Sequence, residues 1–142
     1  MIIHIINGPN LNVLGRRDQS IYGKVGYEEL IERIKSFALS KEIRTEFFQS
    51  NHEGQLIDYI QSLDDSDGLV INPGAFAHYS YAIHDALEIF KGPKVEVHLS
   101  NIFKREEFRS KSVITPACDG VISGLGWYGY ILGIEFIMEK MK

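Results

Sequence analysis

The chain has 142 residues, of which 44% are hydrophobic and 24% charged, and its formal net charge is −4. These values indicate one globular domain over residues 1–142, long enough for a single sizeable core. Lys and Arg are spread along the chain and no apolar run reaches the ~20 residues of a membrane span, so we expect neither a nucleic-acid nor a membrane partner. The single cysteine, Cys118, excludes an internal disulfide framework and a cysteine-rich metal site, and it favours a cytoplasmic location.

Strand-like and helix-like segments alternate along the chain. The first is an apolar run that is too short, and lacks the basic start, for a signal peptide. Hydrophobic periodicity predicts strands at residues 2–6, 43–49, 68–71, 94–98 and 120–123, and helices at residues 27–38, 53–62, 79–90 and 127–141. Asn51 is expected to cap the second helix. Such alternation implies a flavodoxin-like, doubly wound α/β fold: a five-stranded parallel sheet of order 2-1-3-4-5 inside three α/β/α layers.

In this strand order, the loops that leave the first and third strands open into one crevice, where open α/β sheets usually bind ligands. These loops are residues 7–10 and 72–75, and each holds an Asn beside Gly and Pro. We therefore expect two tight turns aimed into the same crevice, with the loop after the fourth strand beside them.

The connection after the first strand, residues 11–26, is longer than the ~2–6 residues usual in such folds. Its glycines offer hinges, and Arg17 precedes Tyr22 by a few residues. We predict a mobile lid that brings a guanidinium and a phenol over the crevice. The alternative is a solvated basic turn with a packed tyrosine.

A phenol acts as a base only when a neighbouring charge favours its ionised form. At the reference pKa of about 10, roughly 0.1% of a phenol is ionised at pH 7, a penalty of about 4 kcal/mol. A desolvated arginine removes part of that penalty, and either Arg17 or Arg109 could supply it.

His78 follows the turn after the third strand, where its side chain would face the crevice, although a capping or packing role fits its position equally well. Asp85 lies two helical turns further on, so we expect it on the same face as His78. His84 is expected at the surface.

The fourth strand ends with two ionisable side chains, Glu96 and His98, which alternation places on one face. A carboxylate beside an imidazole orients the ring and favours its protonated form, which is how a general acid is made. The alternative is a solvated pair on an edge strand. A metal site built from His78, Glu96 and His98 is a further alternative, although no compact ligand motif is present.

Two short segments follow. Residues 105–109 are expected to form a helical turn with most charges solvated, while Arg109 reaches back to a ligand. Residues 124–126 form a glycine turn before the last helix, without the full motif of a nucleotide site.

Three other functions are compatible with the fold. A flavodoxin-type electron carrier would need a phosphate loop rich in Ser and Thr after the first strand, unlike residues 7–10. A phospho-acceptor receiver domain would end its third strand in Asp and its fifth in Lys, where this chain has Asn72 and Ser123. A binding module without catalytic activity remains open, since a set of suitable side chains does not establish turnover.

Together, several segments resemble the type II 3-dehydroquinate dehydratases, hydro-lyases of the shikimate pathway. They follow in the same order over nearly the whole chain: residues 6–12 (INGPNLN), 14–17 (LGRR), 22–23 (YG), 49–54 (QSNHEG), 71–75 (INPGA), 96–101 (EVHLSN), 105–109 (REEFR) and 124–126 (GLG). Each segment alone is weak, but the ordered set is specific. The resemblance implies dehydration of 3-dehydroquinate to 3-dehydroshikimate by anti elimination through an enolate.

The resemblance also implies a role for each matching residue. Tyr22, held as a phenolate by Arg17, would remove the proton from the carbon beside the substrate ketone. Asn10 would hold a water at the enolate. His98, oriented by Glu96, would protonate the departing hydroxyl.

The remaining implied roles concern binding and assembly. The residues implied in binding the substrate's hydroxyl and carboxylate groups are Asn72, His78, Arg109 and the backbone amides of Leu99 and Ser100. Asp85 would reach into a neighbouring subunit's site, because the family assembles as trimers packed into dodecamers. The family uses no metal or other cofactor, forms no Schiff base, and serves aromatic amino acid biosynthesis or quinate breakdown. This chain departs from the usual pattern at residues 18–20, 77, 79, 84, 103–104 and 127–128.

Overall fold

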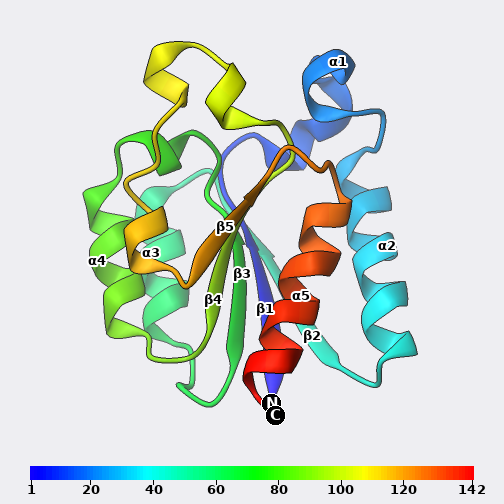
Figure 1. Cartoon of the computed structure of the whole chain (residues 1–142), viewed down its shortest axis with the longest axis vertical. Helices are drawn as coiled ribbons and strands as arrows, with labels where there is room; N and C mark the ends of the chain where they lie inside the picture. The colour runs from blue at the N-terminus through cyan, green and yellow to red at the C-terminus, as the bar shows by residue number, and fades with distance from the viewer.

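The computed structural model describes all 142 residues. Its strands are β1 (Ile2–Asn7), β2 (Arg44–Gln49), β3 (Gly68–Asn72), β4 (Lys94–His98) and β5 (Gly120–Ser123). They form one parallel sheet of order β2-β1-β3-β4-β5 (Figure 1). The predicted flavodoxin-like strand order is therefore confirmed.

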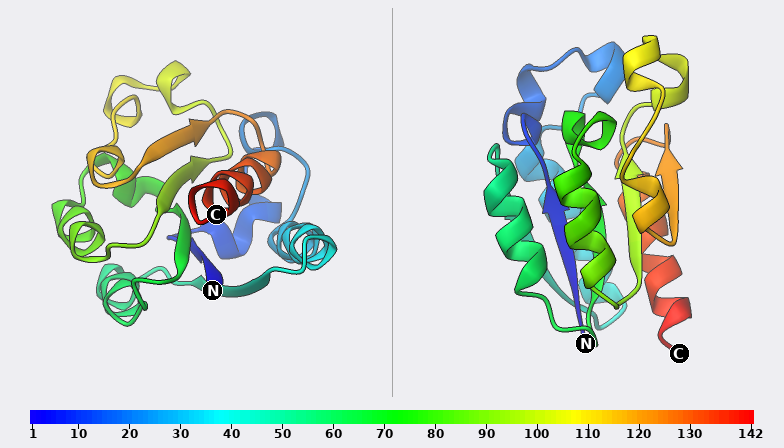
Figure 2. Two further views of the ribbon diagram at one scale, coloured as in Figure 1. Left: turned by 60° about the horizontal axis from the view of Figure 1, so that its bottom comes forward. Right: turned by 90° about the vertical axis from the view of Figure 1, so that its left-hand side faces the viewer.

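The long helices cover both faces of the sheet. They are α2 (Tyr27–Ser40) and α5 (Tyr128–Lys140) on one face, and α3 (Glu53–Gln61) and α4 (Tyr81–Ile89) on the other (Figure 2). The side chains on the two faces form two separate apolar cores, as expected for a parallel sheet buried on both sides. None of the helices is long and apolar enough to cross a membrane.

Short helices gather beyond the carboxyl ends of the strands, at the end of the molecule opposite both termini (Figure 1). They are the 3-10 helices η1 (Leu11–Arg16), η2 (Gly74–His78), η3 (Ile102–Lys104) and η4 (Glu107–Arg109), with the short α-helix α1 (Gln19–Tyr22). A further 3-10 helix, η5 (Thr115–Ala117), lies beside α4 and leads into β5. The predicted lid region is thus not an irregular loop, because η1 and α1 occupy most of it.

The helix predicted at residues 79–90 begins later than its apolar stripe suggested. Ser80 caps α4, its Oγ accepting a hydrogen bond from the amide of Ile83 at 3.1 Å. Tyr79 is extended in φ (−154°) and 59% exposed, so it separates η2 from α4. His78 and Asp85 therefore do not share a helix, and the prediction that they share a helical face was wrong.

The prediction for Asn51 was also wrong. The residue that precedes α3 is His52, which makes no side-chain cap. The Oδ1 of Asn51 instead accepts a hydrogen bond from the amide of Asn10 at 3.0 Å. Asn51 therefore stabilises the turn after β1 rather than a helix.

The turns after β1 and β3 are in direct contact, as the strand order predicted. The amide of Gly8 donates a hydrogen bond to the carbonyl of Asn72 at 2.7 Å. A Cβ atom at Gly8 would lie 2.4 Å from the carbonyl oxygen of Pro73. Gly74, on the opposing turn, has a φ of +60°, which glycine adopts without strain. Glycine at these two positions thus allows the turns after β1 and β3 to pack directly against each other at the floor of the crevice.

We expect Gly8→Ala to lower the free energy of unfolding by about 1–3 kcal/mol, because the added methyl must displace a backbone carbonyl. Urea denaturation followed by circular dichroism measures the change. Gly54→Ala is the matched control, since a Cβ atom there meets open space within α3 and should not lower stability. Equal stabilities of Gly8→Ala and the wild type would contradict the close approach.

Candidate active site

One pocket lies at the carboxyl ends of β1, β3 and β4. Its lining consists of Asn10, Leu11, Arg17, Tyr22, Asn72, Gly74, Ala75, His78, His98, Leu99, Ser100, Ile102, Arg105 and Arg109. All the predicted site residues belong to this lining except Glu96 and Asp85. Glu96 is fully buried on the same face of β4 as His98, whereas Asp85 is exposed on α4.

Glu96 and His98 form a buried pair on a central strand. Their exposed fractions are 0% and 5%, and β4 lies between β3 and β5, so the alternative of a solvated pair on an edge strand was wrong. Nε2 of His98 contacts Oε2 of Glu96 in a hydrogen bond. Nδ1 has no hydrogen-bond partner within the chain, which leaves it as the ring atom available to a bound molecule.

Two hydroxyls complete the partners of the Glu96 carboxylate. Ser112 Oγ donates to Oε2 at 2.8 Å, and Thr115 Oγ1 donates to Oε1. A buried carboxylate without donors is costly, and these bonds offset its desolvation. Sequence reasoning missed Ser112 and Thr115, because a Ser and a Thr in an irregular segment carry no distinguishing signal.

Two arginines converge on the Tyr22 hydroxyl. Arg17 Nη2 donates to it at 2.5 Å and Arg105 Nη1 at 2.8 Å. The Arg17 guanidinium also lies over the phenol ring, with its central carbon 3.7 Å from the ring centroid. Two guanidiniums thus contact the same phenol oxygen.

Arg105, rather than Arg109, therefore acts beside Arg17. Arg109 lines the pocket but forms an ion pair with Glu106 at 2.9 Å. The expectation of mostly solvated charges over residues 105–109 was wrong for Arg105, whose side chain is only 16% exposed. Arg105 belongs to the same short segment as Arg109, the one residue there that was expected to reach a ligand, and both arginines line the pocket.

The concentration of positive charge also affects the arginines themselves. Partial burial lowers the pKa of Arg17, an effect that Tyr22 opposes and that the nearby charges of Arg105 and Arg109 reinforce. A negative charge on the phenol, or on a bound ligand, would relieve this crowding. The pocket is therefore suited to an anion.

The lid holds Tyr22 in place through a local cap. Asp18 begins α1, and its Oδ1 accepts hydrogen bonds from the amide and the hydroxyl of Ser20 at 2.9 and 2.6 Å. These bonds lower the pKa of Asp18. Gly23 ends α1 with a φ of +87°. Residues 18–20 thus form a helix cap directly before Tyr22.

The chain after β4 presents unpaired backbone amides to the pocket. The amides of Leu99 and Ser100 donate no hydrogen bond within the chain. The chain here is fixed from the other side, because the amides of Gly124 and Gly126 donate to the carbonyls of His98 and Leu99 at 3.2 and 3.1 Å. Successive free amides of this kind form an anion-binding nest.

Asn72 is oriented from beneath by a buried hydrogen-bond network. Its Nδ2 donates to the Tyr130 hydroxyl at 2.9 Å, which in turn donates to Asn7 Oδ1 at 2.5 Å. The Oδ1 of Asn72 accepts from the amide of Gly74 at 3.1 Å. Asn7 and Tyr130 are both fully buried, and burial raises the pKa of Tyr130. The sequence pattern marked Tyr130 only as part of the last helix.

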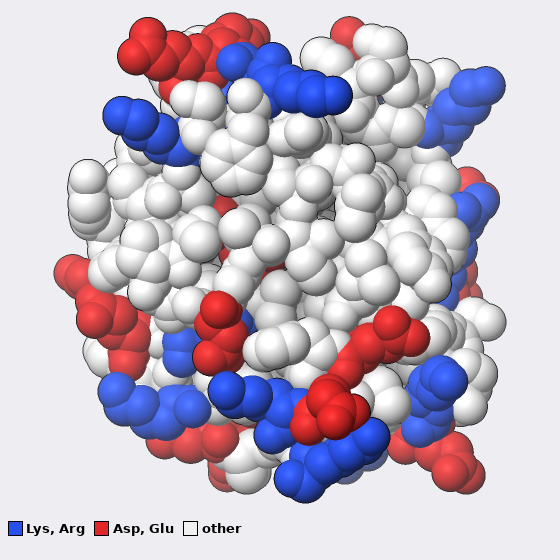
Figure 3. Space-filling model, viewed as in Figure 1, with Lys and Arg blue, Asp and Glu red and all other residues white.

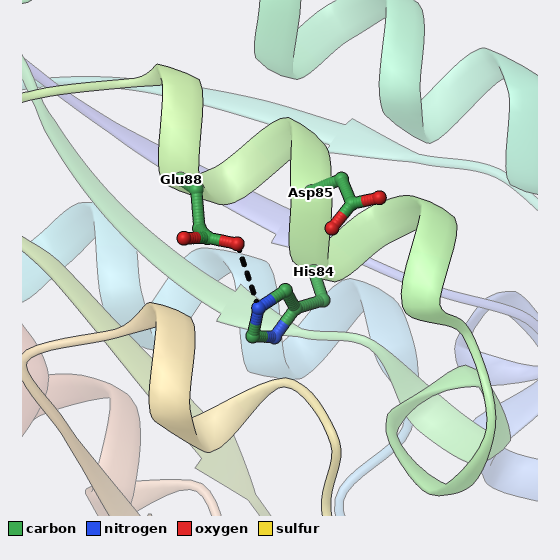
Figure 4. A group of neighbouring side chains, drawn as sticks. All are labelled: His84, Asp85 and Glu88. Carbon is green, nitrogen blue, oxygen red and sulfur yellow. Dashed lines mark ion pairs between the residues drawn. The ribbon is translucent and has the colours of Figure 1, made fainter.

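The alternative of a metal site at His78, Glu96 and His98 is not supported by the structure. His78 Nδ1 donates to the carbonyl of Lys111 at 2.7 Å, and its ring stacks on that of His98 with centroids 6.3 Å apart. The group whose ligand atoms lie within 4.8 Å of one another is a different one, formed by His84, Asp85 and Glu88 on α4 (Figure 4). Both ring nitrogens of His84 already have partners in the chain.

Comparisons with known proteins extend over nearly the whole chain. A family profile described as Dehydroquinase class II matches residues 1–138. The 3-dehydroquinate dehydratase of Thermotoga petrophila is 57% identical, over 100% of this chain and 98% of that protein. Two solved structures of type II dehydroquinases are also similar. That from Butyrivibrio crossotus is 52% identical with a TM-score of 0.94, covering 97% of each chain. That from Propionibacterium acnes is 40% identical with a TM-score of 0.94, covering 97% of this chain and 96% of the other.

We expect Tyr130→Phe to lower the free energy of unfolding by about 1–3 kcal/mol, because it leaves buried amide groups of Asn7 and Asn72 without a partner. Guanidinium denaturation provides the measurement. Tyr128→Phe serves as the control, since Tyr128 is 49% exposed and should change stability little. If both variants were equally stable, the network would not orient Asn72.

Proposed function

This chain belongs to the class II dehydroquinase family, and we propose that it dehydrates 3-dehydroquinate to 3-dehydroshikimate by anti elimination through an enolate. The observation that carries this proposal is the pair of oppositely charged environments at one pocket. A phenol stands between two guanidiniums, and an imidazole stands against a buried carboxylate. Elimination beside a ketone needs a base and an acid of this kind.

Tyr22 is the base. As a phenolate it takes the proton from the carbon beside the ketone, and the electron pair of that C–H bond forms the enolate. Arg17 and Arg105 supply the positive charge that a phenolate requires at neutral pH. The proton then resides on the Tyr22 oxygen.

Asn10 supports the enolate. Its backbone is fixed in a left-handed conformation (φ 69°) and its amide is bonded to Asn51, while its side chain makes no hydrogen bond within the chain. The side-chain amide is therefore free to hold a water against the enolate oxygen. A donor positioned in this way stabilises the charge that develops there.

His98 is the acid. The enolate oxygen re-forms the ketone, and the electron pair of the enolate double bond moves to form a new carbon–carbon double bond to the carbon that bears the hydroxyl. The carbon–oxygen bond of that hydroxyl breaks, and it leaves as water with the proton from His98 Nδ1. Glu96 holds the opposite ring nitrogen and complements the charged imidazole. Tyr22 and His98 must exchange a proton, directly or through solvent, before the next turnover. The net change is the loss of one water from the substrate.

The substrate's other groups are bound around this axis. Its carboxylate is received by the free amides of Leu99 and Ser100, and the positive charge of Arg109 lies on the same pocket. Asn72 and His78 bind hydroxyl groups from the floor. Hydrogen bonds within the chain support this assignment, because they orient both side chains at the pocket: Asn72 through Tyr130 and the amide of Gly74, and His78 through the carbonyl of Lys111.

Assembly and location complete the proposal. Residues 1–142 act as one cytoplasmic, catalytic domain that needs no cofactor, in trimers packed into a dodecamer, for aromatic amino acid biosynthesis or quinate breakdown. Exposed Asp85 reaches a neighbouring subunit's site. In support, the middle of the face over β5 and α5 carries few charged side chains (Figure 3), and Phe136 of α5 is 40% exposed. Such uncharged faces are typical of subunit contacts.

The test of the activity is an ultraviolet assay of the conjugated product, with 3-dehydroquinate as substrate and with chelator and borohydride present. We expect turnover that neither reagent reduces. Absence of turnover would refute the proposed activity. Inactivation by borohydride only in the presence of substrate would indicate an imine and refute the enolate route.

We expect Tyr22→Phe to lower kcat by about 10³-fold or more, because it removes the only phenol in the lid and general-base catalysis contributes factors of this order. Steady-state kinetics gives the value, and circular dichroism checks the fold. Tyr81→Phe is the control, since Tyr81 is 68% exposed and lies outside the pocket. Activity of Tyr22→Phe near that of the wild type would show that another group is the base.

A further inference from the structure

His84 links α4 to the segment that supports the buried carboxylate. Its ring leaves α4 beside Asp85 and Glu88, and its side chain is only 21% exposed (Figure 4). Nδ1 donates a hydrogen bond to the carbonyl of Val113 at 2.7 Å, while Nε2 lies 2.8 Å from Glu88 Oε1. The ring is therefore fixed on both sides, although the sequence predicted only a position at the surface.

Residues 111–115, which we call the 111–115 segment, have no regular structure up to Thr115, the first residue of η5. Three hydrogen bonds fix the first half of this segment to η2 and α4. His78 donates to the carbonyl of Lys111 at 2.7 Å, and the amide of Val113 donates to the carbonyl of Ala77 at 2.8 Å. His84 provides the third. The backbone on either side of Ser112 is thus held from the same side of the molecule.

The 111–115 segment carries the two hydroxyls that donate to Glu96. Ser112 Oγ donates to the carboxylate and also accepts the amides of Ile114 and Thr115 at 3.1 and 3.3 Å. Thr115 Oγ1 donates to the other carboxylate oxygen. A shift of the Val113 carbonyl would therefore move both donors together, and with them the carboxylate that orients His98.

We infer that His84 is a positioning residue for the general acid, acting through the Val113 carbonyl and the 111–115 segment on the Glu96–His98 pair. The inference rests on the proposed function, in which His98 protonates the leaving hydroxyl. His84 does not line the pocket and does not contact the substrate.

Three substitutions of His84 separate the two bonds of its ring. Asn places an N–H group at the position of Nδ1, so it can keep the hydrogen bond to Val113. Gln places an N–H group near the position of Nε2, so it can keep only the bond to Glu88. Ala keeps neither bond. We expect His84→Ala and His84→Gln to lower kcat about tenfold, since small misplacements of catalytic groups cost up to about 100-fold. His84→Asn should retain a kcat close to that of the wild type. KM should change less than about twofold in all three, because the substrate's binding groups are untouched.

Two kinetic outcomes would overturn the inference. One is an unchanged kcat in His84→Ala. The other is an equal loss in His84→Asn and His84→Ala, which would mean that the bond to Val113 is not what matters. If the Ala variant lost only stability or raised only KM, His84 would be a structural residue and the inference would again be wrong.

A spectroscopic readout keeps this test separate from the activity. The imidazole N–H proton of His98 in its bond to Glu96 should give a downfield NMR resonance, identified by its loss in His98→Gln. We expect this resonance to shift or broaden in His84→Ala and to stay in place in His84→Asn. A resonance unchanged in His84→Ala would refute the positioning role even if 3-dehydroquinate proved not to be the substrate. If the wild type dehydrated 3-dehydroquinate but the resonance were unchanged in His84→Ala, only the positioning role would be refuted and the proposed function would be retained.

Discussion

The burial of one carboxylate governs this structure. Glu96 is completely enclosed on the interior strand β4, where a carboxylate must be given hydrogen-bond donors or lose its charge. Those donors are an imidazole from the same strand and two hydroxyls from the 111–115 segment. The need to hold these hydroxyls explains why an irregular segment is bonded so closely to η2 and α4. The carboxylate thereby links the geometry of the acid to elements outside the pocket.

The phenol of Tyr22, the proposed base, has surroundings of the opposite charge. Tyr22 contacts two cations, whereas His98 contacts an anion, so two environments of opposite charge meet in one pocket. Separating an acid from a base by their surroundings is how one site carries out both halves of an elimination. The turns after β1 and β3 provide the floor between them, and their contact at Gly8 leaves no space for a side chain.

The features that depend on periodicity were predictable from the sequence. Alternation along β4 placed Glu96 and His98 on one face, and the order of elements gave the sheet and its crevice. The predictions that were wrong, and the residues that were missed, depended on an interruption of a helix and on contacts between residues distant in the chain. Tyr79 interrupts an apolar stripe that looked continuous, which separated His78 from Asp85. Ser112, Thr115 and Tyr130 matter through residues distant in the chain, and local pattern contains no information on such pairings.

The central claim is that base and acid act at separate steps, and one variant tests it most directly. His98→Gln can retain a donor to Glu96 while removing the proton source at Nδ1. The measurement compares loss of water from 3-dehydroquinate with exchange of the proton beside its ketone for solvent deuterium. We predict that dehydration slows much more than exchange, because Tyr22 still forms the enolate. Equal slowing of both would mean that His98 mainly positions the substrate, and would contradict the assignment of the acid.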